Sequence, residues 1–225
     1  VMLKNEEDAE KKKNLYSIQN AGHRLFNQIG DILDYTEIDT GRLRISEGTY
    51  MISSVVNDII VGNRLLEREH ELELIFDVDA DIPSVLIGDE KKIKKVLEHL
   101  IDNAFKFTKK GGIYVRVYAL KKEYGVNLCI RVNDTGVGIA EEELEKIRER
   151  FYQSNGGRNR RAGGLGLGLS IVYGMVSAME GFMQMESTVA RGTMVSISIP
   201  QKISDETPVM MFEDRLDLCI GCFLR

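Results

Sequence analysis

The chain has 225 residues, of which 43% are hydrophobic, enough for one sizeable core and an appendage. Its formal net charge of -5 gives no general basic surface and argues against nucleic acid as a partner. No apolar run approaches the roughly 18 residues of a membrane span and no signal-peptide pattern is present, so we expect this piece to be soluble and outside the membrane. The three cysteines are too few for a disulfide framework and fit a reducing cytoplasm.

The first predicted element is a long α-helix over residues 5–38. One stripe of the helix recurs at spacings of three and four and consists of Leu15, Ile18, Gly22, Leu25, Ile29 and Ile32, widened by Ala21, Phe26 and Leu33. Gly22 and Gly30 each cost the helix about 1 kcal/mol relative to alanine, so it needs an apolar partner. We therefore expect a dimer or a helix bundle, with the helix ending near Gly41.

From residue 43 the pattern changes to that of a compact domain. The predicted elements are a strand at 43–45, a helix from the N-cap Ser53 to about 69, a strand at 72–78, a helix capped by Asp89 and reaching 107, a hairpin of 113–120 and 126–132, helices at 141–150 and 169–180, and strands at 182–187 and 193–199. Helices lying between hairpin-joined strands favour an α+β fold. We predict a two-layer α/β sandwich with a mixed sheet, preceded by the long helix.

The last stretch, 203–225, is predicted to be a linker at 204–208 followed by the first strand of a truncated segment at 216–224. Cys219 and Cys222 have the spacing of half a zinc site. No second cysteine pair exists in the sequence, so we expect no metal there.

Residues 134–139 follow a predicted buried strand and carry one acid and two glycines. The Asp134 carboxylate can accept a hydrogen bond from an exocyclic amine. Gly136 and Gly138 let the backbone approach a flat base without a Cβ atom in the way. The segment therefore suits the base of a nucleotide.

The helix that begins after Asp89 has a polar face opposite its apolar one, formed by Lys95, His99, Asp102, Asn103 and Lys106. An asparagine amide oxygen is a suitable hard ligand for Mg²⁺, and a lysine supplies a point charge for a phosphate oxygen. Taken alone, the same pattern is equally that of an ordinary solvated helix face.

Residues 164–169 alternate glycine and leucine and lead directly into a helix, whose free N–H groups can bind an anion. Between 153 and 161 lies an unpatterned polar loop with Arg158, Arg160 and Arg161, which has the length of an active-site lid. A polar helix face, an acid-glycine turn and a glycine-rich helix start are together the parts of a nucleotide pocket.

Two further segments follow the same order, Phe151-Tyr152-Gln153 and Gly192-Thr193. In order and spacing all these segments resemble the N box, the two glycine boxes, the F box and the final glycine motif of sensor histidine kinases, within the GHKL ATPases, over residues 43–200. The resemblance implies a Bergerat-type sandwich that binds ATP and Mg²⁺. It implies that Asn103 binds Mg²⁺, Lys106 contacts phosphate and Asp134 reads adenine. The implied nucleotide-binding set also includes Gly136, Gly138, Ile139, Phe151, Arg161, Gly164, Gly166, Leu167, Gly168 and Thr193, and the implied catalytic residues are His99 and Lys106.

Three positions depart from the family pattern. His99 stands where hydrolysing relatives carry a glutamate, which argues against efficient ATP hydrolysis, although Glu98 is adjacent. Arg148 replaces the first phenylalanine of the F box, and Leu165 replaces a small residue between the glycines. We expect these changes to tune affinity rather than to abolish binding.

The family's phospho-accepting histidine lies in a His-acid-x-x-x-Pro context, and no such segment occurs here. Residues 32–42 resemble the end of the second helix of the dimerisation hairpin, so His23 cannot replace the acceptor. We therefore predict a fragment in which 1–41 is a partial dimerisation helix, 42–202 the catalytic ATP-binding domain, and 203–225 a linker and the start of a further segment, such as a receiver domain.

The leading hypothesis is a histidine protein kinase that transfers the γ-phosphoryl of Mg-ATP to a histidine on a missing helix, for relay to a response regulator or receiver domain. The implied setting is a cytoplasmic homodimer, whose parent chain can be tethered to a membrane. Two alternatives remain open at this point. One is a non-catalytic module that senses nucleotide, and the other is a hydrolysing GHKL ATPase.

Overall fold

The computed structural model describes residues 9–70, 72–152, 166–210 and 222–223. Its helices are α2 (Ala9–Asp39), α3 (Ile52–His70), α4 (Glu90–Phe107), α5 (Glu141–Tyr152) and α6 (Gly168–Ala178). Its strands are β1 (Gly48–Tyr50), β2 (Glu73–Val78), β3 (Pro83–Gly88), β4 (Gly112–Lys122), β5 (Gly125–Asp134), β6 (Phe182–Thr188), β7 (Gly192–Pro208) and β8 (Cys222–Phe223).

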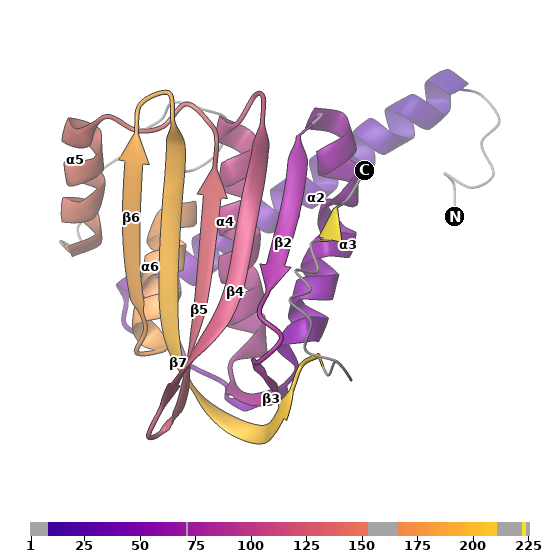
Figure 1. Cartoon of the computed structure of the whole chain (residues 1–225). Helices are drawn as coiled ribbons and strands as arrows, with labels where there is room; N and C mark the ends of the chain where they lie inside the picture. The colour runs from indigo at the N-terminus through magenta and orange to yellow at the C-terminus, as the bar shows by residue number, and fades with distance from the viewer. Residues whose placement is uncertain (1–8, 71, 153–165, 211–221, 224–225) are drawn as a thin grey trace.

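The described strands form one mixed sheet in the order β1-β3-β7-β5-β4-β2-β8, with β6 also paired to β7 (Figure 1). The β2–β4 pair is parallel and the other described pairs are antiparallel. The long strand β7 pairs with β5 and β6 through its first part and with β3 through its last part. Because both are antiparallel to β7, β5 and β6 run in the same direction, and their C-terminal ends lie at the same end of the sheet (Figure 1).

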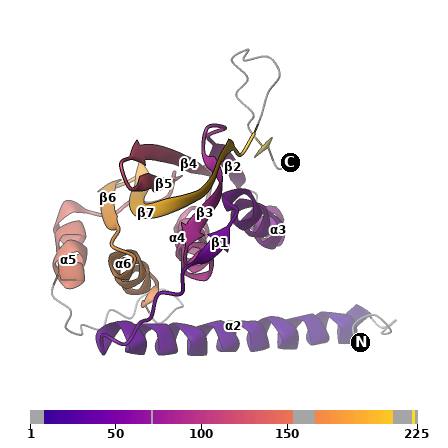
Figure 2. The same ribbon diagram turned by 90° about the horizontal axis from the view of Figure 1, so that it is seen from below.

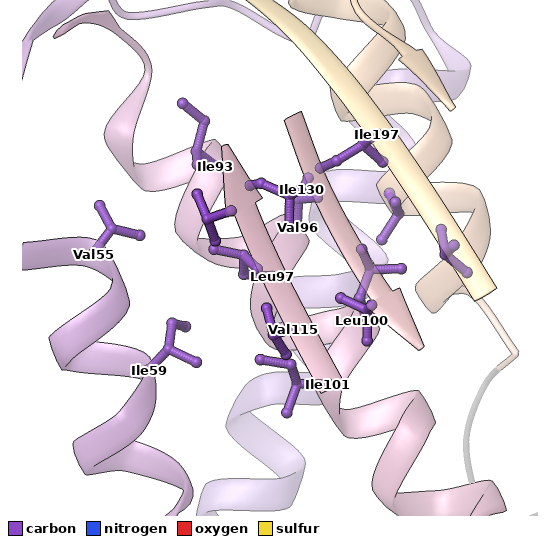
Figure 3. Close-up of a cluster of buried hydrophobic side chains, with 14 of the residues drawn as sticks. Val55, Ile59, Ile93, Val96, Leu97, Leu100, Ile101, Val115, Ile130 and Ile197 are labelled. Carbon is purple, nitrogen blue, oxygen red and sulfur yellow. The ribbon is translucent and has the colours of Figure 1, made fainter. Parts of the chain in front are cut away.

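Helices α3, α4 and α6 cover one face of this sheet, and α2 lies across the outer side of that helix layer (Figures 1 and 2). The core fills the space between the sheet and the helices (Figure 3), with α4 contributing Ile93, Val96, Leu97, Leu100 and Ile101. The predicted α+β sandwich with a mixed sheet and a long leading helix is thereby confirmed.

Helix α4 starts as the sequence predicts. Asp89 is its N-cap and accepts a hydrogen bond from the Lys92 amide at 3.1 Å. The same carboxylate accepts from the Ser46 amide at 2.8 Å, which ties the segment before β1 to the start of α4. Burial alone would raise the pKa of Asp89, but these hydrogen bonds and the Lys92 charge hold it below its usual value.

Helix α2 ends at Asp39, and Gly41 follows with φ +64°, the left-handed conformation that terminates many helices. Near this end, Ile38 packs on α6, where a Cβ added to Gly174 would lie 2.4 Å from the Ile38 Cγ2 atom. The glycine therefore allows the close helix approach. Towards the N-terminus of α2, the apolar stripe is not covered by other residues of this single chain. Phe26 is 76% exposed and Ile18 is 68% exposed.

Several local predictions are wrong. Residues 43–45 form no strand, because Leu43 and Ile45 pack against the core without a ladder partner, and the strand is β1 instead. Ser53 lies inside α3, which begins at Ile52. Strand β3 was not predicted at all. Residues 204–208 are the end of β7, paired with β3, rather than a linker.

The segment 216–224, predicted to begin something new, lies mostly outside the described residues. Its described pair, Cys222 and Phe223, adds to β2 at the edge of the same sheet. Among the helices that the structure describes, none combines the length and apolar character needed to cross a membrane.

Candidate functional site

Asp134 is the last residue of β5 and is buried, with 8% of its surface exposed. Its Oδ1 atom accepts hydrogen bonds from the Gly136 amide at 2.8 Å and from the Thr193 amide at 3.3 Å. Burial raises the pKa of Asp134 above its usual value, and the two amide hydrogen bonds only partly oppose it. No hydrogen bond within the described part of the chain uses Oδ2, so this oxygen can accept from a ligand.

The loop after Asp134 is held by backbone contacts that leave no room for side chains. A Cβ on Gly136 would lie 2.5 Å from the Phe107 carbonyl oxygen, and Val137 donates its amide to that same oxygen at 3.2 Å. The loop is thus joined to the end of α4. A Cβ on Gly138, which has φ +66°, would lie 2.0 Å from the Thr188 carbonyl oxygen of the β6–β7 hairpin.

The start of α6 lies against the polar face of α4. A Cβ on Gly168 would be 3.5 Å from His99 Nδ1 and 3.6 Å from Asn103 Nδ2. The Asn103 Nδ2 and His99 Nε2 atoms are both buried and have no hydrogen-bond partner among the described residues. Unsatisfied buried polar atoms are rare and call for a partner. The predicted asparagine and glycine segments are therefore brought together, with the Asn103 Nδ2 atom unpaired at their contact, whereas the His99 Nε2 atom faces α2.

These residues suit a nucleotide and a magnesium ion. The Asn103 amide offers an oxygen ligand of the kind that Mg²⁺ prefers, and the Gly168 amide region at the helix start favours anions. Asp134 and its glycine loop lie at the edge of the sheet where β5 ends, joined to α4 through the Phe107 carbonyl. The arrangement offers an acceptor for an amine at Asp134, and an unpaired amide and a helix start for an anion beside Asn103.

Helix α2 reaches the same face of α4 through two acids. Lys95 forms ion pairs with Asp34 and, at 3.8 Å, with Asp31. The His99 Nε2 atom is 3.4 Å from Asp31 Oδ1. Burial lowers the pKa of His99 below its usual value, although the charge of Asp31 opposes the shift, so His99 is neutral at neutral pH.

The remaining predicted site residues are placed as follows. Ile139 donates its amide to the Ser187 hydroxyl, and Leu167 packs against the core at the start of α6. Lys106 is exposed, with its Nζ 5.4 Å from the centre of the Phe107 ring, and no described contact joins it to Asn103. Gly166 has φ +70° just before α6.

Three further predicted residues have side chains outside the described part of the structure. Phe151 lies in α5 and its side chain is not described, while Arg161 and Gly164 lie outside the described residues. Ser187 and Asp31 were missed by the sequence analysis. Neither lies in a glycine-rich or periodic polar pattern, and both reach the site only through contacts with residues distant in the chain.

A model of the "Histidine kinase-, DNA gyrase B-, and HSP90-like ATPase" family matches residues 88–203. This range includes the Asn103 face, the Asp134 loop, the start of α6 and Thr193. The chain belongs to this family. Within the family it carries the catalytic ATP-binding domain of sensor histidine kinases, so the predicted resemblance is confirmed.

Relatives of this histidine kinase domain are sensor kinases and a hybrid signal transduction kinase. The "Autoinducer 2 sensor kinase/phosphatase LuxQ" of Vibrio cholerae is 30% identical over 197 residues, covering 88% of this chain and 23% of the relative. The "Sensor histidine kinase RcsC" of Escherichia coli is 33% identical over 184 residues, covering 82% and 19%. The "Hybrid signal transduction histidine kinase B" of Dictyostelium discoideum is 32% identical, covering 89% and 10%. The chain thus spans a quarter or less of these relatives.

Two solved structures share the fold. ShkA in complex with AMPPNP matches with a TM-score of 0.68 at 23% identity, over 90% of this chain and 41% of that chain. The Acinetobacter baumannii histidine kinase AdeS matches with a TM-score of 0.62 at 19% identity, over 85% and 84%. At these identities the likeness concerns the fold alone.

Proposed function

We propose that this domain binds Mg-ATP and transfers the γ-phosphoryl group to a histidine presented on an acceptor helix, for relay to a response-regulator aspartate. The observation that supports it best is the junction of α4 and α6, where the buried Asn103 Nδ2 atom has no partner among the described residues beside Gly168. Phosphoryl transfer depends mainly on positioning and on neutralising charge. This junction offers the positioning, and charge neutralisation is assigned to Mg²⁺ and Lys106.

In this proposal each end of the site has its own task. Asp134 Oδ2 accepts from the exocyclic amine of adenine, while Oδ1 stays held by two backbone amides. The start of α6 directs N–H groups to the phosphates. Asn103 would hold Mg²⁺, which neutralises phosphate charge when bound. His99 and Lys106 are the proposed catalytic residues, the first as a neutral imidazole beside Gly168 and the second as a mobile point charge.

The parent protein is proposed to act as a dimer in the cytoplasm with a response regulator or receiver domain as its partner. The exposed apolar stripe of α2 supports the dimer, because six large side chains there lie open in the single chain, namely Ile18, Leu25, Phe26, Ile29, Ile32 and Leu33. Whether the limits 1–41, 42–202 and 203–225 are functional boundaries stays a prediction.

Transfer to a separate acceptor is the direct test. The domain is mixed with an acceptor hairpin carrying the histidine and with γ-labelled ATP, and label on the hairpin is followed. We expect acid-labile, base-stable label that is lost in Asn103→Ala, because that variant removes the amide beside Gly168. Bound ATP without labelled hairpin would overturn the transfer, and steady phosphate release by the domain alone would instead identify an ATPase.

The raised pKa of Asp134 gives a second expectation. An ionised carboxylate accepts hydrogen bonds at both oxygens, whereas a protonated one donates at one of them. Since burial raises this pKa, protonation begins at higher pH than for an ordinary aspartate, and ATP affinity should already weaken at a pH where an ordinary aspartate is still fully ionised.

Phosphate groups also titrate in this range, so the control is the same series with inosine triphosphate, which has identical phosphates and no exocyclic amine. The ratio of the dissociation constant for inosine triphosphate to that for ATP, measured by calorimetry, should fall towards one as the pH falls. A ratio that is constant with pH would contradict the role assigned to Asp134.

A further inference from the structure

The hydroxyl of Ser187, near the end of β6, joins the Asp134 loop to the β6–β7 hairpin. It accepts a hydrogen bond from the Ile139 amide at 2.8 Å and donates to the Gly192 carbonyl oxygen at 3.0 Å. It also shares a hydrogen bond with the Thr193 hydroxyl at 2.9 Å. Three partners complete the capacity of one hydroxyl, which has one proton and two lone pairs.

This count fixes the direction of the bond to Thr193. A carbonyl oxygen can only accept, so the Ser187 proton is used on Gly192. Ser187 then has no proton left, and Thr193 must donate its own to Ser187. The Thr193 hydroxyl consequently presents lone pairs, and no proton, to its other side.

Thr193 lies directly beside the acid of the site, because its backbone amide donates to Asp134 Oδ1 at 3.3 Å. Asp134 Oδ2 is also an acceptor while the carboxyl is ionised. The β5–β7 register, in which Asn133 pairs with Met194, puts Thr193 opposite Asp134, so both side chains lie on the same face of the sheet. Two acceptors on one face match a group that carries two protons, such as an exocyclic amine. They repel a carbonyl oxygen, which carries none.

We infer that Ser187 is a positioning residue that holds the Thr193 hydroxyl as an acceptor, and thereby makes the pocket prefer a 6-aminopurine over a 6-oxopurine. The inference rests on the proposed nucleotide-binding function and assigns its base specificity. Ser187 itself touches no ligand in this scheme. Its effect passes through Thr193, whose hydroxyl becomes free to rotate and donate once Ser187 is removed.

A Ser187 that only stabilised the Asp134 loop would change the nucleotide affinities in a different way. Ser187 also holds Ile139, so its loss can loosen the Asp134 loop and weaken all nucleotides together. Loss of the acceptor direction instead weakens the discrimination between ATP and inosine triphosphate. The ratio of their dissociation constants separates the two effects, because a common loosening cancels from it.

The test measures both dissociation constants by calorimetry for the whole chain and its variants. Ser187→Ala is expected to reduce the preference for ATP about fivefold, the scale of one hydrogen bond, and Ser187→Thr, which keeps a hydroxyl, to retain it. Thr193→Val should reduce the preference as well. Adding Ser187→Ala to Thr193→Val should change it no further, because both substitutions act on the same acceptor.

The outcomes are distinct. A wild-type chain that binds no ATP overturns the proposed function itself. A wild-type chain that binds ATP without preferring it, or a preference unchanged in Ser187→Ala, overturns the inference and leaves nucleotide binding intact. Additive effects of Ser187→Ala and Thr193→Val would also overturn it, since Ser187 would then act by another route.

Discussion

Asp134→Asn is expected to raise the dissociation constant for ATP about 100-fold, which corresponds to the loss of one hydrogen bond to a charged group and a new mismatch. The amides of Gly136 and Thr193 both donate to Oδ1, so the asparagine must keep its amide oxygen at that position. Its NH₂ group then replaces Oδ2 and faces the amine of adenine, donor against donor. Isothermal calorimetry with magnesium and ATP measures the change.

The same substitution should leave the fold intact. The pKa of Asp134 is raised in the folded chain, so the ionised form is less favourable there than in the unfolded chain. The stabilising contribution of such a group is largest below its unfolded pKa and is lost as the pH rises through the folded pKa. Asparagine carries no charge, so the melting temperature at neutral pH should stay equal or increase.

The matched control is Asp58→Asn on α3. Asp58 is 56% exposed and pairs with Lys94 at 2.6 Å, far from the Asp134 loop in the sequence. Exposed ion pairs contribute about 0–1 kcal/mol, so this variant should bind ATP within about twofold of the wild type. If Asp134→Asn bound ATP as tightly as the wild type, Asp134 would not contact the nucleotide. If Asp134→Asn melted at a much lower temperature than the wild type, the effect on stability argued from the raised pKa would be wrong.

Gly192→Ala is expected to lower the free energy of unfolding by about 3 kcal/mol and to weaken ATP binding along with it. Gly192 has φ +98°, and an added Cβ would lie 1.8 Å from the Asp134 carbonyl oxygen. The obstacle is backbone rather than a flexible side chain, so the hairpin must move away from β5. That movement also displaces the Thr193 amide from Asp134, which couples the loss of stability to the loss of binding.

Thermal unfolding should show this as a decrease of about 10 °C in melting temperature. Gly48→Ala is the control, because Gly48 lies in β1 with no atom within 4 Å of an added Cβ and should change the stability little or increase it. If Gly192→Ala melted like the control, the close approach between the β6–β7 hairpin and Asp134 would not exist in solution.

Local patterns predicted much of the fold because they depend on neighbours in the chain. Helix α4 shows this well, since its cap Asp89 and its apolar stripe are both encoded within a few residues. Strand β3 was not predicted, and it contains Pro83, a residue type that is rare in strands. In the structure Pro83 is the first residue of that strand and lies opposite Pro208, a position where a missing N–H group is tolerated.

The candidate site, like the fold, was predicted where its residues form short local motifs. The motifs around Asn103, Asp134 and Gly168 are compact in sequence, and they were sufficient to indicate a nucleotide pocket and the histidine kinase family, which the family match supports. Their chemistry follows from residue type, since a carboxylate accepts and a glycine gives close approach whatever surrounds them.

What only the tertiary structure decided are contacts between distant segments. The three hydrogen bonds of Ser187, the acids of α2 against Lys95 and His99, and the contact of Ile38 with Gly174 leave no periodic trace in the sequence. Residue types and spacing therefore indicated the chemistry of the candidate site. The fold decides which hydroxyl groups and which charges lie at that site, because their placement depends on partners that are adjacent only after folding.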